Sequence, residues 1–258
     1  GRLAHGVCAK DMMLHMIARF GMNGGQYQAV EFAGAAVQAL SMAERMTLSN
    51  MSAEMGAQAG LIAADATTTA HLQSIGVSPE RLAGAEQWFT DEDAEFEQHR
   101  FDASSLSPQV AAPHSPANTR DVAEFADVVP SIAYIGACTG AKLEDLRAAA
   151  LVLKGQRVAA GVQLMVAPAS AREQAQAQQE GVMQILQDAG ATVLPNSCGA
   201  CAGYGATFPE GSTVISSTAR NFKGRMGPAS VNVYLASPYT VAASALRGRI
   251  SDAREVLA

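Results

Sequence analysis

Three cysteines have the spacing and surroundings that could hold a metal centre. Cys198 and Cys201 stand at C-x-x-C spacing, so a tight turn can aim both thiols at one point. Glycine and alanine flank them, which lets the backbone approach a bulky group closely. Cys138 lies about 60 residues upstream and can join them only if the fold brings it there. Three thiolates suit an iron–sulfur cluster with one iron left open, or a zinc site with one open position.

Spacing alone leaves other interpretations open. A C-x-x-C pair also occurs as a redox pair, as half of a zinc site, or as two packed cysteines. The context favours a site, because each cysteine stretch follows an apolar, strand-like run, 131–135 in one case and 191–194 in the other. Ligand sites collect at the carboxyl ends of strands in open α/β sheets.

The elements that must position these cysteines follow an alternating pattern. In the second half, strand-like and helical runs alternate, which indicates a parallel sheet with crossover helices and an α/β fold class. The expected strands are 131–135, 162–167, 192–194, 213–216 and 232–235, and the expected helices are 142–153, 171–189 and 239–247. In the first half, apolar spacing predicts helices over 10–22, 33–40 and 50–59 and a short strand at 29–32.

A proline-rich connection divides the chain. Residues 106–118 contain Pro108, Pro113 and Pro116, so they predict a non-helical segment. We expect two α/β domains, 1–122, with a linker from about 103, and 123–258.

Composition bounds the function. The 258 residues are 48% hydrophobic and 16% charged, as in ordinary globular proteins. The net charge of −6 argues against a nucleic-acid partner, and an anionic substrate would need a few well-placed arginines. The sequence has no run of 18 apolar residues, the length that a membrane-spanning helix needs. Four cysteines without a secretory leader predict a reducing, cytoplasmic location.

Several stretches, in matching order, resemble motifs of the aconitase superfamily. A middle-domain stretch lies at 40–57, and the first cysteine stretch, with the helix after it, lies at 136–149. The C-x-x-C stretch lies at 197–201, an arginine stretch at 217–227, and the strand that follows it at 233–238. The resemblance covers nearly the whole chain and is nearest to large subunits of isopropylmalate isomerase-type dehydratases. It implies aconitase-type α/β/α domains. Because the first residues resemble an interior family segment, it also predicts a fragment or processed product without the family's N-terminal catalytic histidines.

The resemblance implies a [4Fe–4S] cluster and the residues around it. The cluster ligands would be Cys138, Cys198 and Cys201. Asn50 and Glu54, four residues apart on one face of the expected helix, would be catalytic: Glu54 would hydrogen-bond the hydroxyl or water on the open iron, with Asn50 beside it. Two arginines of the arginine stretch would bind substrate carboxylates, namely Arg220 and Arg225.

The implied reaction is reversible dehydration and hydration of a small hydroxy di- or tricarboxylic acid, of the 3-isopropylmalate type used in leucine biosynthesis. The resemblance predicts a separate small subunit with the swivelling domain, in a heterodimer or heterotetramer, and a chain that is inactive without that subunit and the missing N-terminal domain. Maleate or a methyl-substituted malate is an alternative substrate. A truncated, non-catalytic cluster-binding or iron-sensing module is the alternative from another class, and a zinc site comes third.

The sequence departs from the family pattern at three positions. Gly140 and Ala219 stand where the family usually has Asn, and Cys8 stands where it usually has Thr. We expect Cys8 to be a buried small residue and not a ligand.

Overall fold

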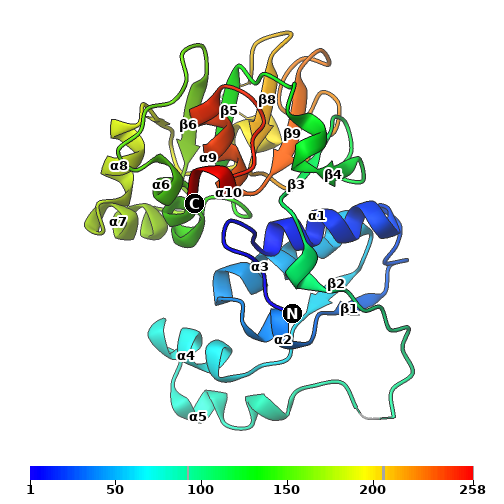
Figure 1. Cartoon of the computed structure of the whole chain (residues 1–258). Helices are drawn as coiled ribbons and strands as arrows, with labels where there is room; N and C mark the ends of the chain where they lie inside the picture. Colours follow the sequence, from blue (N-terminus) through cyan, green and yellow to red (C-terminus); the bar gives the residue numbers. More distant parts are fainter. Residues whose placement is uncertain (92, 205–206, 258) are drawn as a thin grey trace.

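The computed structural model describes residues 1–91, 93–204 and 207–257. Figure 1 shows the first half of the chain (blue to cyan) beneath a larger second half (green to red). The helices are α1 (Ala9–Phe20), α2 (Ala35–Gln38), α3 (Met42–Met51), α4 (Ala66–Ser74), α5 (Pro79–Leu82), α6 (Leu143–Leu153), α7 (Ala171–Gln179), α8 (Val182–Asp188), α9 (Pro238–Arg247) and α10 (Arg254–Leu257). The strands are β1 (Ala29–Glu31), β2 (Ala59–Leu61), β3 (Gln109–Ala111), β4 (Thr119–Asp121), β5 (Ile132–Gly136), β6 (Gln163–Ala167), β7 (Thr192–Val193), β8 (Thr213–Ser216) and β9 (Asn232–Ala236).

A seven-stranded sheet organises the second half, in the order β4-β3-β9-β8-β5-β6-β7. The five strands from β9 to β7 are parallel, whereas β3 and β4 join antiparallel at one edge. The observed strands and crossover helices confirm the predicted α/β class. From β5 the chain moves to one side through β6 and β7 and later returns to the other side through β8 and β9. The order therefore reverses between β5 and β8, and ligands bind at such switch points.

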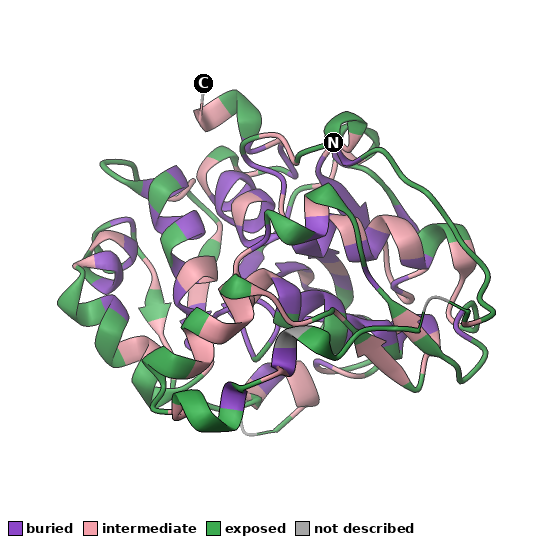
Figure 2. Ribbon diagram, turned by 90° about the horizontal axis from the view of Figure 1, so that it is seen from below, coloured by how far each residue is buried: buried purple, intermediate pink, exposed green. Residues whose placement is uncertain are grey.

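The two faces of the sheet are covered by different parts of the chain. Side chains alternate along a strand, so Ala133 and Ile135 of β5 join the core formed with α6, α8 and α9. Ile132 and Tyr134 face the opposite core, which contains the apolar sides of α1 and α3. Figure 2 shows the buried residues along the middle of the molecule and the exposed ones on the outer helices and loops. The first half is thus the layer that closes one face of the sheet.

Two helix predictions are wrong in detail. The helix expected over 50–59 begins earlier, as α3, because Ser41 caps it and exchanges hydrogen bonds with Glu44 in a capping box. It ends at Met51 and continues as a 3₁₀ turn, η1 (Ser52–Met55). The single helix expected over 171–189 is two helices, α7 and α8, separated at Gly181 (φ 74°).

Residues 109–121, placed in the first domain and its linker by the sequence, form the β3–β4 hairpin on the edge of the second-half sheet. The boundary between 122 and 123 stays a prediction. No helix among the described residues has the length and apolar character required to cross a membrane.

Candidate functional site

The first cysteine loop leaves the carboxyl end of β5 through a tight turn. Ala137 has a positive φ of 64°, unusual for a residue with a side chain, and Cys138 follows it. Ser217, just after β8, holds both sides of the turn: its Oγ accepts a hydrogen bond from Gly136 N (3.0 Å) and donates one to Gly140 O (2.9 Å). A Cβ on Gly140 would overlap the backbone oxygen of Ser217. This close approach explains why glycine stands at this position.

The second cysteine loop crosses the end of β6 on its way toward β5. Leu194 N donates to Val166 O (2.8 Å), and Asn196 Nδ2 donates to Pro168 O (3.3 Å). The C-x-x-C stretch then forms a 3₁₀ turn, η5 (Gly199–Ala202). A Cβ on Gly203, which ends this turn, would lie 2.8 Å from Arg225 O, so the turn packs against the arginine loop.

The three thiols lie near one another. Burial raises the pKa of Cys201 most, negative charges on Cys138 and Cys198 raise it further, and the neighbouring Arg225 guanidinium opposes the rise. All four cysteines of the chain are free thiols. No three His, Cys, Asp or Glu side chains of the described residues stand at the spacing of a single metal ion.

The arginine loop faces the first half of the chain. Arg220 Nε donates a hydrogen bond to Glu54 Oε1, and this ion pair raises the pKa of Arg220; charges on Cys201 and Cys138 contribute as well. Glu54 is 2% exposed, and its other oxygen, Oε2, has no partner among the described residues. The buried Nε of Arg225 is also without a partner there. The arginine loop and the glutamate that it holds therefore each carry one unmatched polar group.

Asn50 is placed differently from Glu54. The expectation that both share one helix face is wrong, because α3 ends at Met51 and Glu54 lies in the 3₁₀ turn that follows. Asn50 is exposed, whereas Glu54 is buried. The catalytic role of Asn50 stays a prediction.

Sequence reasoning missed two buried lysines that tie the halves together at the site. Lys10 Nζ, on α1, donates to Ser217 O (2.7 Å) and Thr218 O (2.5 Å), at the start of the arginine loop. Burial lowers the pKa of Lys10 to about 8. Lys142 Nζ, before α6, donates to Thr47 Oγ1 of α3 (3.0 Å). Lys142 lies in the first cysteine stretch, but its spacing does not indicate a partner on α3, and for Lys10 only the surrounding hydrophobic segment could have hinted at burial.

Asn221 was also missed, although it lies inside the arginine stretch. Its Nδ2 donates to Ala112 O (2.8 Å) and to Val233 O (3.0 Å), which joins the loop to the β3 edge and to β9. Cys8, the fourth thiol, caps α1. Burial and the charge of Asp11 raise the pKa of the Cys8 thiol. None of the other three cysteines is among the described groups that shift this pKa.

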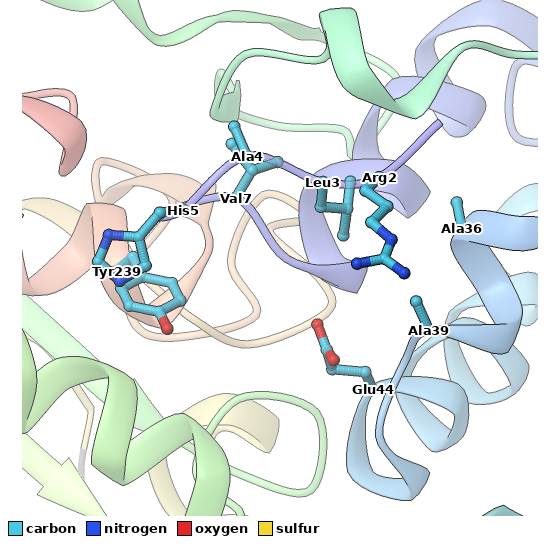
Figure 3. A pocket seen from close by; sticks show the side chains of 10 residues that line it. Arg2, Leu3, Ala4, His5, Val7, Ala36, Ala39, Glu44 and Tyr239 are labelled. Carbon is cyan, nitrogen blue, oxygen red and sulfur yellow. The ribbon is translucent and has the colours of Figure 1, made fainter.

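A separate hollow of about 400 Å³ lies beside the N-terminal segment. In Figure 3 the Arg2 guanidinium and the Glu44 carboxylate point into it, with His5 and Tyr239 at its other end. None of the predicted site residues lines this hollow.

The fold and the thiol site define a known class of protein. The sequence matches the family described as the aconitase family (aconitate hydratase) over residues 1–129 and 123–248, so the chain belongs to the aconitase family. It is 41% identical over 259 residues to the 3-isopropylmalate dehydratase large subunit 2 of Archaeoglobus fulgidus, which covers 100% of this chain and 61% of that protein. The 3-isopropylmalate dehydratase large subunit of Elusimicrobium minutum is 41% identical to this chain, in a match that covers 100% of this chain and 61% of that protein. The large subunit of Picrophilus torridus is 40% identical, in a match that covers 99% of this chain and 61% of that protein. The chain thus spans about three fifths of the length of these relatives.

Proposed function

We propose that this chain is the cluster-bearing part of a hydro-lyase that acts on a small hydroxy di- or tricarboxylic acid of the 3-isopropylmalate type. The observation that carries the proposal is the Glu54–Arg220 pair: Glu54 Oε2 is buried and unmatched, and Arg220 is near enough to the thiols for charges on Cys201 and Cys138 to raise its pKa. Membership of the aconitase family and the names of the relatives support the reaction class.

The thiol site fits a [4Fe–4S] cluster better than a single metal ion. Three free thiols act on one another electrostatically, namely Cys138, Cys198 and Cys201. Within the described residues they do not stand close enough together to bind a single metal ion. Thiolates around a four-iron cluster stand farther apart than those around zinc, because the cluster itself fills the space between them. Bound by these three cysteines, the cluster would supply Lewis acidity at an iron that lacks a protein ligand.

The neighbouring side chains would bind and orient the substrate. Arg220 and Arg225 present guanidinium groups that can donate paired hydrogen bonds to carboxylates. Arg220 also holds one oxygen of Glu54, which fixes the direction of the other. Glu54 Oε2 is then free to hydrogen-bond a substrate hydroxyl, to give it the proton with which it leaves as water, and to take a proton from water in the hydration direction. Asn50 would assist from the rim of the site.

The partner and the location belong to the same proposal. The relatives are named as large subunits, which supports a small subunit in a heterodimer or heterotetramer. That subunit would carry the swivelling domain, and this chain alone would be inactive. Three neighbouring free thiols require reducing surroundings, which supports a cytoplasmic location.

The test is anaerobic purification with iron and sulfide analysis, followed by EPR of the reduced protein with and without 3-isopropylmalate. About four iron and four sulfide per chain, and a spectrum that changes with this substrate, would support the proposal. Arg225→Lys should keep the cluster and weaken the spectral response, because lysine cannot form the paired bonds. Zinc instead of iron, or no metal after reconstitution, would contradict it. A cluster that responds only to maleate or a methylmalate would reassign the substrate.

A further inference from the structure

Tyr134, on β5, is a buried donor that nothing in the proposed reaction uses. It is 0% exposed, and its hydroxyl has no hydrogen-bond partner among the described residues. Leaving such a group unmatched destabilises the folded state. An apolar side chain would fill this core at no such cost, so the hydroxyl needs a partner that is not part of the described chain.

The phenol lies between the two cysteine loops. The hydroxyl is 4.0 Å from the place that a Cβ on Gly199 would occupy, directly inside the C-x-x-C stretch. On the other side, a Cβ on Gly136, two residues before Cys138, would lie 2.6 Å from the same oxygen. Glycine at both positions leaves room for the ring. Phe208 packs edge-on against it, with 5.6 Å between ring centroids, and limits its movement.

A tyrosine hydroxyl is a hydrogen-bond donor at neutral pH, because its ordinary pKa is about 10. Burial, and then the charges of Cys201 and Cys198, raise the pKa of Tyr134 to about 12. The hydroxyl therefore keeps its proton at neutral pH and stands next to groups that are negative as thiolates. The phenol thus faces the side of the site where Cys198 and Cys201 would hold the cluster.

We propose that Tyr134 donates a hydrogen bond to a sulfur atom of the cluster on the Cys198–Cys201 side. This inference rests on the proposed cluster site. Hydrogen bonds to the sulfurs help to set the reduction potential of an iron–sulfur centre. A donor stabilises the more negative, reduced state, so Tyr134 raises the potential and helps the protein to retain the cluster.

The test compares Tyr134→Phe with Tyr234→Phe, both purified and reconstituted anaerobically. Tyr234 is a matched control, because it lies on β9 and packs on the opposite core against Phe125. Loss of a bond to a charged acceptor changes the redox equilibrium about tenfold, or about 59 mV for one electron. EPR-monitored titration should show a lower potential by about this amount in Tyr134→Phe and no change in Tyr234→Phe. The Tyr134→Phe cluster should also be lost faster on dilution.

The metal-free proteins give a second measurement. Tyr134→Phe removes an unmatched buried hydroxyl and keeps the ring, so the metal-free variant should unfold at the same temperature as the unaltered protein, or higher. Lower cluster retention in a variant that folds this well identifies a lost bond to the cluster. An unchanged potential and retention would overturn the role of Tyr134 and leave the cluster site standing. Unaltered protein without iron and sulfide would overturn both.

Discussion

Substitution of Gly140 tests whether Ser217 holds the first cysteine loop. A Cβ at residue 140 would overlap Ser217 O and lie 2.6 Å from Ser217 Cβ, so the two loops must separate. Overpacking of this kind costs about 1–3 kcal/mol. Separation also breaks two hydrogen bonds, Gly136 N to Ser217 Oγ and Ser217 Oγ to Gly140 O, at about 0.5–1.5 kcal/mol each. Gly140→Ala should therefore cost about 2–6 kcal/mol.

The assay is thermal unfolding of the metal-free protein, with iron content after reconstitution. A loss near 3 kcal/mol corresponds to a fall of about 6–12 °C in Tm for a protein of this size. Ser217→Ala is the reference, because it removes the two bonds but leaves the backbone oxygen in place; it should cost less. Gly140→Asn, which restores the usual family residue, should be at least as harmful as Gly140→Ala. Full iron content and an unchanged Tm in Gly140→Ala would refute the argument.

Three further predictions concern single residues. Cys8→Ser should keep the full iron content and Cys198→Ser should lose it; equal loss in both would contradict the ligand assignment. Glu54→Gln should keep the cluster by iron analysis but lower kcat of the assembled enzyme at least about 10²-fold, as expected for a lost proton-transfer group; wild-type turnover would remove Glu54 from the reaction. Burial raises the pKa of Asp11 from 3.8 to about 6. Between these two pH values the Asp11 carboxyl keeps its proton in the folded state and has released it in the unfolded state. Stability should rise by about 2 kcal/mol as pH falls from about 6 to 4, and urea unfolding of Asp11→Asn should lack this rise.

The succession of strands along the second half of the chain, and the cysteine loops after two of them, could be predicted because local patterns specify them. Apolar runs separated by helical periods mark β5 to β9, and each cysteine stretch follows its strand directly. The start of α3 was missed although its signal was present: Ser41 and Glu44 have the spacing of a capping box. The error mattered, because it placed Asn50 and Glu54 on one helix face.

The contacts that shape the site could not be predicted from local patterns. Ser217 and Gly140 are 77 residues apart, and Lys10 reaches a carbonyl 207 residues away. Periodicity says which side chains face a core, but not which backbone group a buried ammonium or hydroxyl will meet. Tyr134 shows the same limit: alternation predicts that it is buried, and only the fold places its hydroxyl beneath the C-x-x-C turn.

The buried polar contacts between the halves indicate what the first half contributes to the site. Taking the ammonium of Lys10 out of water is costly, and its lowered pKa reflects that cost. The cost is offset where two carbonyls accept its hydrogen bonds, and both belong to the start of the arginine loop. Glu54 then contacts the same loop through Arg220. Through these contacts α1 and the 3₁₀ turn after α3 hold the arginine loop, whereas the cysteines lie on loops of the second half. The first half is therefore part of the site, and cluster binding and substrate binding should respond differently to its loss.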